Sequence, residues 1–136
     1  MKKLIYAMLA LSLVAFVGCK KDKDKQKEVT VENLVGTWEI YKTYDDGEWD
    51  TEWGVAVGYQ SILKINANGT GTMETIEEEY RNTTSFTYKM ASSGTITITT
   101  SYGDTRQVKV KSLTDKELVL EYSEYGATYA EYYKRK

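Results

Sequence analysis

The chain has 136 residues, with 18 Lys and Arg, 20 Asp and Glu, no His, no Pro and one Cys. This length supports one domain, and the net charge of −2 argues against a nucleic-acid-binding protein. The missing His removes the commonest general base and zinc ligand, and a single Cys forms neither an internal disulfide nor a thiolate metal cluster. The 12 Tyr and 3 Trp favour a β-rich fold.

Residues 1–18 have the layout of a bacterial secretory signal peptide. Two lysines precede an uncharged run of 15 residues, which is shorter than the roughly 20 needed to span a bilayer. The run ends in Phe16-Val17-Gly18-Cys19, which resembles the lipobox of bacterial lipoproteins, although Phe16 stands where Leu is usual. The resemblance implies cleavage after Gly18 and acylation of Cys19 by palmitate-type chains. The alternatives are an uncleaved anchor, or ordinary secretion with a free Cys19 thiol.

A lipidated Cys19 implies that the protein is anchored by its N-terminal lipid in the envelope of a Gram-negative-type bacterium, at the outer membrane. The sequence does not indicate whether it faces the periplasm or the cell surface. Residues 19–32 are then predicted to form a tether, because eight of the nine residues 20–28 are charged and none is apolar. Such a stretch buries too little surface to offset its ordering entropy, so we expect it to be disordered. A sorting or surface-export signal is the alternative. The folded domain is predicted to span residues 33–136.

From residue 33 onward, apolar and polar residues alternate with the period of a β-strand, between turn signals such as Asn68-Gly69. The pattern predicts about eight strands near residues 38–41, 63–65, 70–76, 86–90, 95–99, 108–111, 118–121 and 128–135, with a helical turn possible at 33–36. Short turns favour an all-β antiparallel up-and-down meander that closes into a small barrel, with a two-sheet sandwich as the alternative. Residues 48–60 fit neither period and are predicted as a long loop or lid.

The alternation also predicts which side chains point into the barrel, and none of this set is charged. The predicted lining consists of Trp38, Ile40, Leu63, Ile65, Phe86, Tyr88, Met90, Ile96, Ile98, Val108, Val110, Leu118 and Leu120. Such an interior suits an apolar guest, since burying an unpaired charge there is costly. Thirteen bulky side chains could equally fill an eight-stranded barrel by themselves.

Several short motifs resemble those of bacterial lipocalin-like domain lipoproteins. Gly36-Thr37-Trp38 is similar to the Gly-x-Trp signature of the first lipocalin strand. Residues 63–70 (LKINANGT), the leucine pair at 118 and 120, and the basic end at 132–135 look like later family markers. The resemblance implies a lipocalin-like barrel in which Trp38 plugs the closed end, with Arg135 or Lys134 packed on its ring. The domain is shorter than a typical lipocalin, which argues against a roomy cavity.

Two acidic runs and a group of aromatics remain as candidate sites. Five carboxylates within residues 45–52 favour a solvated hairpin tip over a calcium site, because their spacing does not match the twelve-residue calcium loop. Residues 77–79 are three glutamates, which are expected in an exposed turn. Trp49, Trp53 and Tyr59 either cap the barrel or contact a ligand.

These observations favour a non-enzymatic, lipid-anchored binding module that carries a small apolar or amphipathic ligand. They predict no catalytic residues, cofactor or metal. The alternative is a structural or interaction lipoprotein with a packed barrel, whose loops bind a protein or a glycan. The sequence does not identify the ligand.

Overall fold

In the computed structural model, the described residues are 25–45, 48–54 and 57–136, and the side chains of residues 48–52 lie outside this description. Cys19 and the predicted signal peptide therefore lie outside the described residues, and so do Asp46 and the side chain of Trp49. The described part is all-β apart from one helical turn, and no helix in it is long and apolar enough to cross a membrane. Its elements are α2 (Val31–Leu34), β1 (Gly36–Asp45), β2 (Glu48–Glu52), β3 (Tyr59–Ile65), β4 (Thr70–Glu77), β5 (Tyr80–Met90), β6 (Thr95–Thr100), β7 (Thr105–Leu113), β8 (Glu117–Glu124) and β9 (Ala127–Arg135).

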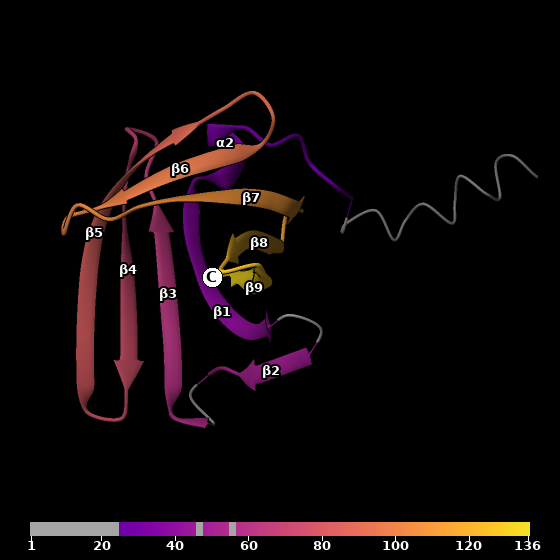
Figure 1. The fold of residues 1–136 in the computed structure, drawn as a ribbon. Coiled ribbons are helices and arrows are strands. Elements are labelled where there is room, and N and C mark those ends of the chain that lie inside the picture. Colours follow the sequence, from indigo (N-terminus) through magenta and orange to yellow (C-terminus); the bar gives the residue numbers. More distant parts are fainter. Residues whose placement is uncertain (1–24, 46–47, 55–56) are drawn as a thin grey trace, which may run out of the picture.

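The predicted meander is confirmed. Strands β1 and β3 to β9 pair antiparallel in chain order, and β9 returns to pair with β1, so that eight strands close into a barrel (Figure 1). In Figure 1, β3, β4 and β5 lie side by side while β6 and β7 cross them at a steep angle, which is the curvature that closure requires.

The segment predicted as a long loop or lid contains a strand, so the prediction is wrong for residues 48–52. Strand β2 pairs with the second half of β1, with Tyr44 opposite Trp49, and Gly54 forms a bridge with Tyr59 at the start of β3. Period-two alternation does not show here because β2 is an edge strand only five residues long.

Glycine permits one close approach between neighbouring strands. Gly71 on β4 lies opposite Phe86 on β5, and an added Cβ would come within 2.3 Å of the Phe86 ring. The ring of Phe86 therefore packs directly over the backbone of β4, where any larger residue would displace it.

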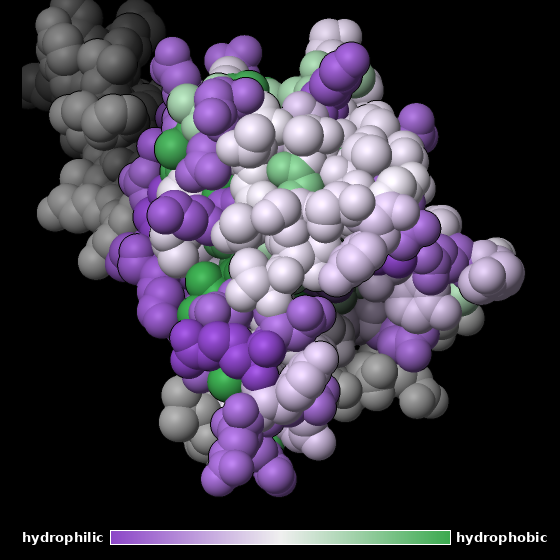
Figure 2. Space-filling view, turned by 90° about the vertical axis from the view of Figure 1, so that its left-hand side faces the viewer, coloured by the Kyte–Doolittle hydropathy of each residue, from purple (hydrophilic) through white to green (hydrophobic). Residues whose placement is uncertain are grey.

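The apolar side chains of the strands gather inside the barrel. The buried core consists of Leu34, Trp38, Ile40, Leu63, Ile65, Phe86, Tyr88, Ile96, Val108, Val110, Leu113, Leu118, Leu120 and Tyr133. Figure 2 shows the outer face around β5, where surface of near-neutral hydropathy is bordered by hydrophilic residues and apolar spots are small. The pale surface reflects the outward Thr and Ser of β4 to β6, which alternate with the buried residues.

One end of the barrel is sealed by Trp38, which is fully buried. Its indole Nε1 donates to the carbonyl oxygen of Leu34 at 2.9 Å, and the Arg135 guanidinium lies 4.1 Å from the ring centre. The contact expected between Trp38 and a basic residue of the last strand is thus made by Arg135, whereas the Lys134 ammonium lies over the ring of Tyr41. Gly36 has a φ of +149°, and an added Cβ there would lie 2.4 Å from Arg135 Nη1, so this residue leaves room for the guanidinium.

The chain contacts the barrel before the predicted boundary at residue 33. The Lys27 amide donates to the carbonyl of Leu113, and the Gln26 side chain bonds Ser112 Oγ at 2.8 Å. Val29 and Val31 then pack against the core. The described part of the predicted tether therefore reaches the sealed end of the barrel at the end of β7.

We predict that Trp38→Ala lowers the free energy of unfolding by about 3–5 kcal/mol, because it replaces a fully buried indole with a cavity. Denaturant unfolding of the chain from Lys20 measures this loss. Tyr102→Ala, at a side chain that is 74% exposed, serves as the control and should change the unfolding free energy little. Equal stability of the Trp38 variant and the wild type would contradict this account of the sealed end.

Candidate functional site

The end of the barrel opposite Trp38 is hollow. A cavity of about 720 Å³ opens among β3 to β9, with Asp104 of the β6–β7 turn, Thr105 at the start of β7 and Glu124 at the end of β8 at its rim. At the sealed end, the space beside Leu34, Ile65, Tyr88 and Ile96 is only about 20 Å³. The sequence did not decide between a hollow and a packed interior. The structure shows a barrel that is packed in one half and hollow in the other.

The predicted lining residues divide between these two halves. Leu63, Phe86, Ile98, Val108 and Leu120 line the cavity, joined by Met73, Tyr122 and Tyr133, which the predicted set lacks. The sealed half of the barrel holds the predicted residues Trp38, Ile40, Ile65, Tyr88, Ile96, Val110 and Leu118. Met90 is partly buried against the core and does not line the cavity.

The cavity wall also carries charge, unlike the uncharged lining that the sequence predicts. Arg106 on β7 forms a 2.7 Å ion pair with Glu124 on β8, and its guanidinium lies 4.6 Å from the ring centre of Tyr122. Deeper in the barrel, Glu131 on β9 lies opposite Leu120 and accepts a 2.8 Å hydrogen bond from the Tyr133 hydroxyl. These polar groups therefore lie on the β7–β9 side of the cavity.

The carboxyl of Glu131 has a raised pKa in the folded protein. It keeps part of its surface accessible because it faces the cavity, yet it lies so far inside the barrel that desolvation raises its pKa. The Tyr133 hydrogen bond and the charge of Arg106 oppose this rise. Burial, together with the neighbouring Glu131, raises the pKa of Tyr133 well above its ordinary value. Tyr133 is therefore the donor in this pair.

Sequence reasoning missed Glu131 because both faces of the strand at residues 128–135 carry Tyr together with polar or charged residues. The pattern therefore does not show which face points into the barrel. The signal that could have found it is the spacing of Tyr129, Glu131 and Tyr133, which share one face of a strand. Tyr122 and Tyr129 do pair across β8 and β9, with rings stacked at 5.4 Å.

The predicted loop aromatics are placed in part. Trp53 packs against the core, and its ring meets that of Tyr59 edge-on at 6.3 Å, while Tyr59 stays 44% exposed. The Trp53 Nε1 is buried without a hydrogen-bond partner among the described residues. Trp53 therefore packs on core side chains, and its role as a barrel cap or a ligand contact stays a prediction.

The acidic runs give no site in the described part of the chain. Glu77, Glu78 and Glu79 are exposed at the β4–β5 turn, as predicted, with Glu78 at a φ of +50°. Of the run at 45–52, Asp45 pairs with Tyr129 in the β1–β9 ladder, and the other four carboxylates lie outside the description. Among the described residues, no three carboxylates come together as a metal site.

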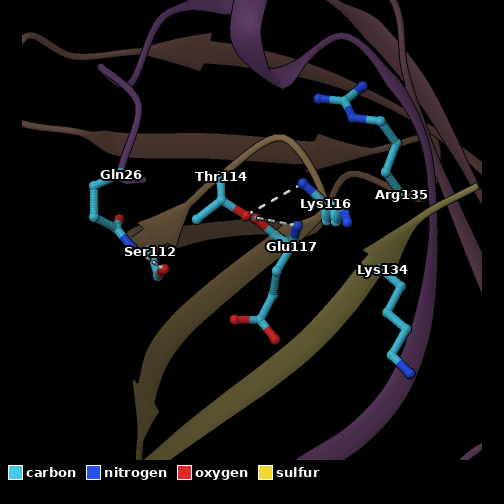
Figure 3. Close-up of a pocket in the computed structure, with 7 residues that line it drawn as sticks. All are labelled: Gln26, Ser112, Thr114, Lys116, Glu117, Lys134 and Arg135. Atoms are coloured by element: carbon cyan, nitrogen blue, oxygen red, sulfur yellow. Dashed lines mark hydrogen bonds between the residues drawn. The ribbon is translucent and has the colours of Figure 1, made fainter. Parts of the chain in front are cut away.

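A second hollow of about 600 Å³ lies outside the barrel, between the N-terminal segment and the β7–β8 turn (Figure 3). Two of its lining side chains, Thr114 and Glu117, already accept hydrogen bonds within the protein, and Gln26 bonds Ser112. Thr114 Oγ1 accepts from the amides of Lys116 and Glu117, and Glu117 accepts from the Tyr41 hydroxyl. These contacts give the groove a structural role in fixing the turn and the incoming chain.

We predict that Glu131→Gln raises the melting temperature at pH 7. The Glu131 carboxyl has a higher pKa in the folded than in the unfolded chain, so the folded state loses stability as pH rises from the ordinary value of 4.5 through the folded one. Glutamine keeps the acceptor for Tyr133 without this loss. The titratable and charged groups that interact with Glu131, namely Arg106, Tyr122 and Tyr133, are the same in both proteins.

The gain should shrink as the pH falls below about 4.5, which thermal unfolding across pH measures. The control is Glu121→Gln, which removes a carboxylate paired with Lys111 at 3.4 Å outside the barrel and should not raise the melting temperature at pH 7. A variant that melts below the wild type at pH 7 and equals it at pH 4 would show that the fold stabilises the ionised Glu131.

Comparison with known proteins agrees with the barrel. The family model described as "Lipocalin-like domain" matches residues 34–120, which run from the end of α2 into β8. The search of curated proteins gave no match. Barrels of this kind generally bind ligands in their interior. Because the match covers more than half of the 136 residues, the chain belongs to the lipocalin-like domain family.

Proposed function

We propose that the protein binds a small apolar or amphipathic molecule in the open half of its barrel and acts as a lipid-anchored binding module of the cell envelope. The observation that carries this proposal is the interior cavity of about 720 Å³, which lies within the roughly 300–1,000 Å³ of small-molecule sites. A fully packed barrel of this family would have no such volume.

The lining supports an amphipathic ligand. On the side of β3 to β6, Leu63, Met73, Phe86 and Ile98 offer apolar contact. On the side of β7 to β9, Arg106 and Glu131 offer charge. A ligand with an apolar body and one polar group satisfies both walls, since few placed polar groups in a mostly apolar pocket fix the orientation of a ligand.

Binding, without catalysis, is the function that these side chains support. The sequence contains no His to activate a hydroxyl nucleophile. The Glu131 carboxyl is already hydrogen-bonded to Tyr133, and Glu124 is paired with Arg106. The alternative of an interaction lipoprotein that binds a protein or glycan requires a filled barrel, and the cavity weighs against it.

The proposed anchor suits this arrangement. The described chain begins beside the sealed end, where Gln26 and Lys27 contact β7. A lipid on Cys19 would attach the barrel by that end, so that the cavity mouth lies at the opposite end. The signal-like residues 1–18 and the charged residues that follow Cys19 support this part of the proposal.

We predict that the chain from Lys20, which contains every described residue, binds the neutral fluorophore N-phenyl-1-naphthylamine with a rise in its fluorescence. Thr84→Trp should reduce this binding, because residue 84 lines the cavity and an indole would fill part of it. Thr83→Trp, on the exposed outer face of the same strand, should leave binding unchanged. No binding to the folded wild type would overturn the ligand proposal in favour of the interaction lipoprotein.

The anchor is tested separately. We predict that Cys19→Ala abolishes incorporation of labelled palmitate and leaves the signal peptide uncleaved, because both reactions require the thiol. Metabolic labelling and mass spectrometry of the mature N-terminus measure the two outcomes. A wild-type protein released in soluble form with a free Cys19 thiol would contradict the proposed lipidation.

A further inference from the structure

Resting on the proposed function, we propose that the cavity selects amphipathic ligands that carry a basic amine, and that the ammonium group pairs with the carboxylate of Glu131. The sequence and the family comparison indicate a ligand-binding barrel without indicating the charge of its ligand. The charges that line the cavity supply that information.

The first observation is the excess of acid in the cavity wall. Its charged side chains are three carboxylates, from Asp104, Glu124 and Glu131, and one guanidinium, from Arg106. A cationic ligand complements this excess, whereas an anionic ligand adds a further negative charge to it. In a partly desolvated site, such charge complementarity carries more weight than at an open surface.

The second observation is that Arg106 is already engaged. Its guanidinium pairs with Glu124 at 2.7 Å and stacks on the ring of Tyr122 at 4.6 Å. A ligand carboxylate on this guanidinium would lie beside the negative charge of Glu124, which already holds Nη2. Arg106 therefore neutralises one carboxylate of the rim and leaves Glu131 as the deeper group that faces the cavity.

The third observation is the unused hydrogen-bonding capacity of Glu131. A carboxylate has about four acceptor sites, and the described residues supply one donor, the Tyr133 hydroxyl at 2.8 Å. An ammonium group brings up to three N–H donors, which match these sites. Pairing also offsets the desolvation that makes an isolated ammonium costly to bury.

The depth of Glu131 places the rest of the ligand. Glu131 is level with Leu120 and Val110 in the β7–β9 ladder, whereas Arg106 and Glu124 lie nearer the strand ends at the mouth. Between this level and the sealed end at Trp38, the barrel is filled. When the ammonium group of a ligand binds at Glu131, the apolar part of that ligand therefore lies against the wall formed by Leu63, Met73 and Phe86.

The test compares three ligands of equal chain length for displacement of N-phenyl-1-naphthylamine at pH 7, namely dodecylamine, dodecan-1-ol and dodecanoate. Each is used below the concentration at which it forms micelles or separates from solution. We expect dodecylamine to bind about tenfold or more tightly than dodecan-1-ol, as for one charge-assisted hydrogen-bonded pair. Dodecanoate should bind most weakly. In Glu131→Gln, dodecylamine should lose its advantage while dodecan-1-ol keeps its affinity.

Glu121→Gln is the matched control, because it removes the same charge from the outer face of β8. It should keep the preference for the amine, and melting curves check that both variants are folded. Equal binding of amine and alcohol, or equal loss in both variants, would overturn the assignment to Glu131 while leaving a ligand-binding barrel. Tightest binding of dodecanoate would likewise overturn it and identify Arg106 as the recognition group. Failure of the fluorophore and of all three ligands to bind would overturn the proposed function itself.

Discussion

The architecture depends on the junction between the first and last strands of the barrel. Strand β9 pairs with β1, and the Arg135 guanidinium at the end of β9 stacks on Trp38. The same guanidinium donates to the carbonyl oxygens of Asn33, Val35 and Asp115. One side chain thus ties the helical turn before β1, the β7–β8 turn and the last strand to a single buried ring. A meander without this closure would expose two edges.

Closure at one end determines where the space in the barrel lies. Trp38 and Leu34 fill the interior beside the junction, and the side chains above them complete a packed half. Toward the opposite end, smaller or polar residues such as Thr84, Thr100 and Glu131 face inward and leave the volume unfilled. The asymmetry of the barrel therefore comes from the distribution of side-chain size along each strand.

The sequence predicts the parts of this structure that follow from local pattern. Period-two alternation identifies the meander and the apolar wall, because a residue such as Leu63 or Val108 is buried by strand geometry once its strand forms. It does not predict β2, which is short and lies at an edge. It also does not predict the packing of Val29 and Val31 against the core, because that packing depends on strands distant in the sequence. The pairing of Arg106 with Glu124 follows from the β7–β8 register, which a bulge after Val110 shifts by one residue.

Glu131 is the position where local rules and structure disagree most, and the disagreement bears on function. A leucine there would suit a packed barrel, since an apolar side chain avoids the desolvation that raises the pKa of the Glu131 carboxyl. Departures from the rules of core composition are expected at functional sites, where stability is given up for a specific interaction. Tyr133, fully buried, holds the carboxyl in one orientation through its hydroxyl. A fixed carboxyl is a more selective partner for a ligand than a mobile one, because less freedom is lost when the pair forms.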